Sequence, residues 1–443
     1  MTAGEVVPFS EIIWAEFIHD DVSVAECWCG IIPHLRCRLQ ENARRIKSLC
    51  IDAFALGFRR ADHSRCPGSI FLVYESQSNV GNEGSLQMMP IERIEDWERR
   101  IERQDAFWDC DVIDRPVVVM TLPKDKPEYP WPKEKTYDSP RDRWMDTERV
   151  VESALAGALN TEFLGDALPT AWPNLGPELF SAFFGMEMEY TAETSWGIPN
   201  LRDWSEAGKL KLSTDNCYWK KLLEMTDALL NAGRGKYYVG FTDFHPGGDA
   251  IAAFRDPMQL NIDLLTSRDE VKSLLRRINA EYFDAFGFYA ARFRLAEQAF
   301  TSWPGIVSSC KWYVPSNDFS CMVSKEMFDE VFLPGIIEEC RRLDASIYHL
   351  DGPDALRHLD SLLRIKELNA IQWVYGAGRG VASDWLHVYK RCQAAGKGIQ
   401  LHIGFDELDT IASNLKPEGV WMSVAVQDRA QADAVLARVS AWN

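Results

Sequence analysis

The sequence predicts an α/β fold, a (β/α)8 TIM-type barrel preceded by an N-terminal extension, and three observations support this prediction. Ser346–Gly380 contains two short apolar strands around one amphipathic helix, a unit that makes a parallel strand pair. From Val117 onward, strand and helix signals alternate along the whole chain. Polar side chains follow the strands where they end, as they do in barrels that carry out chemistry there. A doubly wound open sheet is the second choice.

Eight short apolar runs, bounded by Gly, Pro or polar residues, have the composition of strands buried on both faces. They are Val117–Met120, Leu168–Trp172, Tyr237–Thr242, Gly305–Ser309, Ser346–Leu350, Ala370–Val374, Gly398–Ile403 and Gly419–Val424. Phe319–Val323 is a ninth candidate, as an edge strand or a loop.

Helices are predicted between these strands. Ile91, Ile94, Trp97 and Ile101 share one helical face before the first strand. A capping box at Ser267–Glu270 starts a second helix, and a third begins after Ser324. The segment Lys124–Arg143, rich in Pro, Lys and Asp, predicts a long loop of the kind that often forms a lid or binding loop.

The chain is expected to divide into an N-terminal extension, residues 1–88, and a barrel domain, residues 89–443. The extension has weak periodicity and ends in the polar stretch Ser76–Ser85, which is typical of a linker. It also contains a tight group whose spacing matches no zinc motif: Cys27, Cys29, His34 and Cys37.

Composition excludes several classes of function. A formal net charge of −18 argues against nucleic acid or an anionic membrane surface as a partner. No run of about 18 apolar residues occurs, and the first ten residues lack the features of a secretory signal. The eleven cysteines are irregularly spaced, which favours reduced thiols and a cytoplasmic location.

The residues that follow the strands supply carboxylates, imidazoles, amides and indoles, the groups that acid–base catalysis and substrate binding need. The candidate catalytic residues are His349, Asp351, Asp243 and Asp318. The candidate substrate-binding residues are Trp172, Asn174, His245, Trp312, Gln372, Trp373, Tyr375 and His402.

Each candidate residue also has an interpretation in which it supports the fold and takes no part in a site. His349 and Asp351 lie two residues apart, on one face of an extended chain. Asp351 could instead cap the next helix, with His349 as a core residue. The loop that begins at Asp243 could be a plain turn, because it contains two glycines. His358 is predicted to lie on the solvent side of its helix. The tryptophans are predicted to form pocket wall or core.

Sequence motifs argue against several cofactors and classes of reaction. In Gly376-Ala377-Gly378-Arg379-Gly380, the third glycine comes one residue too early for a dinucleotide fingerprint, which argues against a nicotinamide cofactor. No P-loop, H-E-x-x-H or G-x-S-x-G sequence is present.

From Arg115 to Asn443 the chain resembles the uroporphyrinogen decarboxylase superfamily of (β/α)8 barrels, which includes decarboxylases and corrinoid-dependent methyltransferases. The resemblance rests on these segments: Asp318-Phe319-Ser320, Phe328 with Pro334, Tyr348-His349-Leu350-Asp351-Gly352, Ile371-Gln372-Trp373 with Gly376 and Gly378, and, more weakly, Trp172–Pro177 and Thr242-Asp243. It adds Ser320 to the candidate substrate-binding residues.

The resemblance implies a zinc site in which a His-x-Cys pair and a later cysteine bind the metal. Here His349 matches the histidine, but Asp351 replaces the cysteine, and Ser423 and Val424 stand where the later one is sought. The usual thiol-activating zinc site is therefore broken, although His349 and Asp351 could contribute to an oxygen-rich metal site. The arginine cluster with which the decarboxylases hold propionates is also missing after the first strand, which argues against porphyrinogen decarboxylation.

The function expected from the sequence is methyl transfer from a small molecule to a corrinoid or thiol acceptor, with a corrinoid protein as a partner. The alternative is a cofactor-free decarboxylase or other lyase in which the same acids and imidazoles stabilise and protonate a carbanion. A glycoside hydrolase and a non-catalytic binding protein are third choices.

Overall fold

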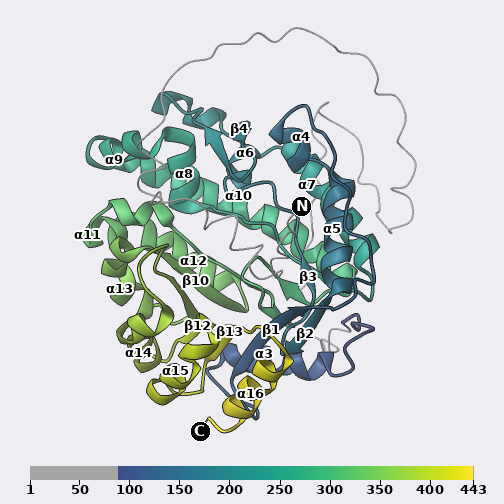
Figure 1. The fold of residues 1–443 in the computed structure, drawn as a ribbon. Helices are drawn as coiled ribbons and strands as arrows, with labels where there is room; N and C mark the ends of the chain where they lie inside the picture. Colours follow the sequence, from purple (N-terminus) through teal and green to yellow (C-terminus); the bar gives the residue numbers. More distant parts are fainter. Residues whose placement is uncertain (1–87, 443) are drawn as a thin grey trace, which may run out of the picture. The chain divides into compact units, whose positions relative to one another are not determined.

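A computed structural model describes residues 88–442, and a seven-stranded sheet lies at the centre of this part of the chain (Figure 1). The strands are β1 (Val117–Pro123), β2 (Thr161–Gly165), β3 (Thr170–Ala171), β4 (Glu187–Tyr190), β5 (Ser195–Ile198), β6 (Tyr238–Val239), β7 (Phe300–Thr301), β8 (Val307–Ser308), β9 (Trp312–Tyr313), β10 (Ala345–Asp351), β11 (Ala370–Val374), β12 (Gly398–Gly404) and β13 (Val420–Ala425).

The central sheet has the order β2-β1-β13-β12-β11-β10-β9. All neighbouring pairs are parallel except β1 and β2, which are antiparallel. The first and last strands pair side by side, with Val117 opposite Trp421. Most residues of these strands are buried, as expected for parallel strands covered on both faces.

Helices connect and cover the strands, and α13, α14 and α15 follow one another along the outer side of β10–β13 (Figure 1). The helices are α3 (Trp97–Trp108), α4 (Pro140–Trp144), α5 (Thr147–Asn160), α6 (Leu179–Ala182), α7 (Cys217–Gly233), α8 (Gly247–Arg255), α9 (Pro257–Thr266), α10 (Arg268–Leu295), α11 (Lys325–Met327), α12 (Leu333–Arg342), α13 (Leu359–Leu363), α14 (Leu386–Ala394), α15 (Leu408–Asn414) and α16 (Arg429–Ser440). Between α11 and α12 the chain forms a π-helical segment, η3 (Phe328–Phe332).

The predicted closed barrel is not confirmed, because the paired strands of the described residues leave the central sheet open. The strands predicted at 168–172 and 237–242 shorten to two residues each, and they pair with each other as β3 and β6. The run predicted at 305–309 is the second strand of an antiparallel hairpin, β7 and β8. Gly305 makes this reversal with a φ of 79°, a conformation that favours glycine.

Five of the predicted strands are confirmed, as β1, β10, β11, β12 and β13. The ninth candidate is wrong as a strand, since residues 318–322 form a 3-10 helix, η2 (Asp318–Met322). The edge of the sheet beside β10 is instead β9. Helices are present at the three predicted places, but α3 begins at Trp97, so that Ile91 and Ile94 precede it. Ser267 makes no side-chain capping bond at the start of α10. The predicted loop after β1 has no helix or strand before α4.

At the amino end of β1, a charged network joins the chain before and after the strand. Asp166 is fully buried and accepts hydrogen bonds from Arg115 Nη2 at 2.9 Å, Arg103 Nη1 at 3.1 Å and the Val118 amide at 3.0 Å. The side chain of Gln104, also buried, donates to the Asp166 carbonyl at 3.0 Å. Every oxygen of Asp166 therefore has a partner.

The N-terminal extension and its group of Cys27, Cys29, His34 and Cys37 lie outside the described residues. In the described part of the chain, none of the helices has the length and apolar character needed to cross a membrane.

Candidate functional site

Three neighbouring strands place polar side chains in one row. His349 of β10 is in register with Gln372 of β11, which is in register with Gln400 of β12. Hydrogen bonds connect the row: His349 Nδ1 lies 2.5 Å from Gln372 Oε1, and Gln372 Nε2 donates to Gln400 Oε1 at 2.9 Å. Gln400 Nε2 then donates to the Pro304 carbonyl at 2.9 Å.

This row fixes the tautomer of His349. Because the Gln372 amide group donates to Gln400, its oxygen is the atom that faces the imidazole and accepts a proton from Nδ1. The other ring nitrogen, Nε2, is then free to accept a proton or bind a metal. Trp303 packs edge-on against the imidazole, with ring centroids 5.1 Å apart.

Two carboxylates lie near the imidazole of His349, and we call Asp318, His349 and Asp351 the acid–imidazole cluster. Asp318 Oδ1 is 4.0 Å from Nε2, and each of the three residues offers one ligand atom within 4.8 Å of the others. Although 44% of the Asp318 side chain is exposed, its Oδ1 atom is buried and has no hydrogen-bond partner among residues 88–442. The loop after β9 and the end of β10 bring these groups together.

The surroundings of the cluster raise the pKa of both acids. Loss of solvation and the negative charge of Asp249 raise the pKa of Asp318 to about 7, although His349 and His245 oppose the shift. Loss of solvation also raises the pKa of Asp351, against the effect of His349. An acid that titrates near neutrality can both give and take a proton at physiological pH.

A second group of charges lies in the loop between β6 and α8. His245 Nε2 is 2.7 Å from Asp243 Oδ1, and His245 Nδ1 is 3.5 Å from Asp249 Oδ2. Asp249 also accepts from the amides of Asp318 at 3.1 Å and Phe319 at 2.9 Å. This segment is therefore more than a plain turn, since Asp249, in the first turn of α8, binds the backbone of Asp318, one acid of the cluster.

Loss of solvation disfavours a positive charge on His245, but the carboxylates of Asp243 and Asp249 outweigh it and raise the pKa of His245 well above its ordinary value. His245 is consequently an imidazolium at neutral pH, paired with Asp243. It helps to balance the negative charge around Asp318.

Several predicted binding residues lie away from the acid–imidazole cluster. Trp312 is a core residue whose indole donates to the Phe300 carbonyl at 3.0 Å, and Asn174 accepts from the Gly176 amide at 2.9 Å in a turn. Trp373 and Tyr375 pack on Trp385, with ring centroids 5.2 and 5.9 Å away.

The remaining candidate binding residues are Trp172, Ser320 and His402, and they differ in burial. Trp172 is half-buried after β3, and Ser320 is buried in η2. His402 lies on β12 two residues beyond Gln400, with its ring 6.4 Å from that of Trp421. Loss of solvation lowers the pKa of His402 to about 4, so that it is neutral at physiological pH.

The prediction that His358 faces solvent is wrong. The residue is completely buried, its Nε2 lies 2.9 Å from the Ser320 carbonyl, and its ring stacks on Phe328 with centroids 4.2 Å apart. The helix predicted there begins as the 3-10 turn η4 (Pro353–His358), which changes the face on which the side chain lies.

Sequence reasoning did not single out Gln400 or Glu339, although each had a signal. Gln400 alternates with His402 along a strand that is otherwise apolar. Glu339 lies on the apolar face of α12, three residues after Ile336, and is almost completely buried. A polar residue at an apolar position is the more informative exception.

The acid–imidazole cluster could hold a divalent cation. It supplies one imidazole nitrogen and two carboxylates, a donor set suited to zinc, manganese or iron(II) rather than to soft, thiolate-binding ions. Two observations fit this role: the buried Oδ1 of Asp318 has no hydrogen-bond partner within the residues that the structure describes, and Gln372 orients His349.

Comparison with known proteins places the fold but not the family. No family model matches the chain, and no curated protein has a similar sequence. The structure is similar to a methyltransferase from Methanosarcina mazei, with a TM-score of 0.50 and 10% sequence identity, over 76% of this chain and 97% of that one. At this identity the likeness concerns the fold alone.

Proposed function

We propose that the protein is an enzyme that transfers a methyl group from a small molecule to a corrinoid or thiol acceptor at the acid–imidazole cluster. The observation that carries the proposal is the orientation of His349: Gln372 holds its Nδ1, and its Nε2 points toward Asp318. The methyltransferase fold of the Methanosarcina mazei protein supports the same class of reaction by analogy.

The chemistry follows from the charges at the site. A divalent cation bound by Asp318, His349 and Asp351 would polarise an acceptor or leaving atom. As ligands of this cation, Asp318 and Asp351 would be carboxylates, so the proton that the leaving group takes up when its methyl group departs would come from water at the site. His349 and the Gln372–Gln400 row keep this geometry fixed before the substrate binds.

A lyase is the second candidate, and the raised pKa of Asp318 is the observation that favours it. In a decarboxylase without a cofactor, a protonated acid near neutrality can protonate the carbanion that remains after carbon dioxide leaves. Metal binding separates the two candidates.

We also propose that the fold is a distorted barrel. The Gly240 amide donates to the Ala171 carbonyl, and the Phe241 amide donates to the Thr301 carbonyl, so that backbone hydrogen bonds connect β3, β6 and β7. We infer that these short strands form the side of a distorted barrel opposite β10–β13, that residues 1–88 are an extension to it, and that the enzyme acts in the cytoplasm.

The first experiment titrates chelator-treated protein with Co²⁺ and follows its visible absorbance. One equivalent should bind, and His349→Ala should abolish binding. Gln372→Leu should weaken it about tenfold, because the residue only orients His349. His387→Ala, at an exposed histidine of α14, is the matched control.

The second experiment supplies cob(I)alamin with methylated thiols, amines and aromatic ethers and follows the absorbance of methylcobalamin. The wild-type protein should form it from at least one donor, and His349→Ala should be about 100-fold slower. Absence of both Co²⁺ binding and methylcobalamin would contradict methyl transfer and leave the lyase.

A further inference from the structure

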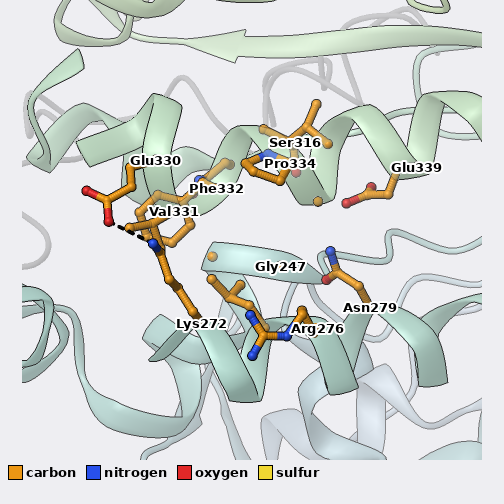
Figure 2. A pocket seen from close by; sticks show the side chains of 15 residues that line it. Gly247, Lys272, Arg276, Asn279, Ser316, Glu330, Val331, Phe332, Pro334 and Glu339 are labelled. Carbon is orange, nitrogen blue, oxygen red and sulfur yellow. Dashed lines mark hydrogen bonds and ion pairs between the residues drawn. The ribbon is translucent and has the colours of Figure 1, made fainter. Parts of the chain in front are cut away.

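A cavity of about 220 Å³ lies beside the cluster, between α10, the η3–α12 segment and the start of α8 (Figure 2). None of the residues of the acid–imidazole cluster lines it, and neither do His245 and Asp249. The cavity is thus separate from the proposed reaction centre, although Ser316 lines the cavity and lies 3.4 Å from both His245 Nδ1 and Asp249 Oδ2.

The inner wall of the cavity is polar, and some of its side-chain atoms have no hydrogen-bond partner among residues 88–442. Asn279, Asn317 and Glu339 are 7, 3 and 2% exposed. Within residues 88–442, Asn279 Oδ1 and both polar atoms of the Asn317 side chain have no hydrogen-bond partner. A buried polar atom without a partner destabilises the folded protein, so a set of such atoms around one space indicates a missing occupant.

The backbone leaves room for these amides. A Cβ atom on Gly248 would lie 2.6 Å from Asn317 Oδ1, and one on Gly335 would lie 2.4 Å from Asn279 Nδ2. The π-helical segment η3 forms another wall, through Val331 and Phe332. π-Helical turns are rare and often occur at functional sites.

The side of the cavity formed by α10 carries positive charge. Lys272 and Arg276 lie one turn apart on α10 and point toward the cavity (Figure 2). Lys272 is paired with Glu330 at 2.7 Å, whereas Arg276 is exposed and forms no ion pair with any described residue. A ligand would thus meet a guanidinium group near solvent and neutral amides deeper inside.

We propose that this cavity binds a small carboxylic acid that carries a hydroxyl or amide group at its other end. Arg276 and Lys272 hold the carboxylate, and Asn279, Asn317 and Glu339 bind the polar end. Loss of solvation raises the pKa of Glu339 to about 8, so that its carboxyl group is largely protonated and does not repel the ligand. The site does not depend on the proposed reaction, and either can fail alone.

The test measures binding of 4-hydroxybutyrate by calorimetry, with butyrate and 1,4-butanediol as probes that each lack one of the two groups. We expect 4-hydroxybutyrate to bind about tenfold more tightly than either. Arg276→Met should reduce its affinity about tenfold, while Arg294→Met, at an exposed arginine of the same helix, should leave it unchanged.

Asn279→Leu tests the inner wall of the cavity and should also reduce the affinity for 4-hydroxybutyrate about tenfold. Arg276→Met is the companion variant, because Arg276 is exposed and its replacement leaves the packing unchanged. Equal affinity for the three probes would overturn the proposal, as would no binding at millimolar concentration. A gain in thermal stability of Asn279→Leu without any binding would identify the space as a simple packing defect.

Discussion

Asp166 and Asp318 lie at opposite ends of the central strands and have opposite surroundings. Asp166, at the amino end of β1, is fully buried and has hydrogen bonds from two arginines and a backbone amide. Asp318, beyond the carboxyl end of β9, is partly exposed and lies near other acids, and its buried Oδ1 has no hydrogen-bond partner in the described part of the chain.

This difference separates an acid that stabilises the fold from one that is kept reactive. A buried carboxylate whose oxygens all accept hydrogen bonds from arginines and backbone amides contributes to folding. A carboxylate near other acids keeps a pKa close to neutrality, at a cost in stability that folding alone does not explain. Substitutions at the two ends should therefore change stability in opposite directions.

Asp166→Asn should give the largest effect. It leaves Arg115 partly buried without its carboxylate and should lower the free energy of unfolding by about 3–5 kcal/mol. Urea unfolding followed by circular dichroism measures the change. Asp114→Asn, at the exposed partner of Arg103, is the control and should cost at most about 1 kcal/mol. An equal loss of unfolding free energy in Asp166→Asn and Asp114→Asn would show that Asp166 does not stabilise the fold more than an exposed acid does.

Glu339→Gln should stabilise the protein in a pH-dependent way. The folded state raises the pKa of Glu339 from 4.5 to about 8, so ionisation favours the unfolded chain and stability falls as pH rises between these values. The neutral side chain removes this loss, which amounts to about 3 kcal/mol at pH 7 and almost nothing at about pH 4. Denaturant unfolding at both pH values checks the prediction, and Glu338→Gln, at the exposed neighbour, is the control and should change the free energy of unfolding by at most about 1 kcal/mol.

Asp318→Asn should give the smallest change in stability, and with the opposite sign to Asp166→Asn. Because the folded state raises the pKa of Asp318, the charged form is disfavoured at neutral pH and its removal should stabilise the metal-free protein. The gain should be about 1 kcal/mol at pH 7, since 44% of the side chain is exposed and solvent screens its charge. A loss of stability in chelator-treated protein would show that Asp318 supports the fold as Asp166 does.

The sequence predicted the carboxyl-terminal half of the sheet well, because long apolar strands alternate there with helices. β10, β11 and β12 lie where the pattern placed them, and the structure brings His349, Gln372 and Asp318 together at their ends. Strand register explains this success: parallel neighbours put His349 opposite Gln372.

The same reasoning failed where elements are short. β3, β6 and β9 contain two residues each, too few for a period to be read. Trp373 follows Gln372 directly and so points to the other face of β11, where it packs on Trp385 instead of near His349. The partners of Asp166 and the surroundings of Glu339 depend on contacts distant in sequence, which no local pattern contains.

The pairing of β1 with β13 also affects how the protein is made. Trp421 of β13 donates a hydrogen bond to Gln104, a residue 317 positions earlier in the chain. During synthesis, the edge of β1 therefore has no neighbouring strand until β13 has left the ribosome. We expect a nascent chain that ends before β13 to require a chaperone, and a chain that contains β13 to fold slowly, since contacts of such long range form late.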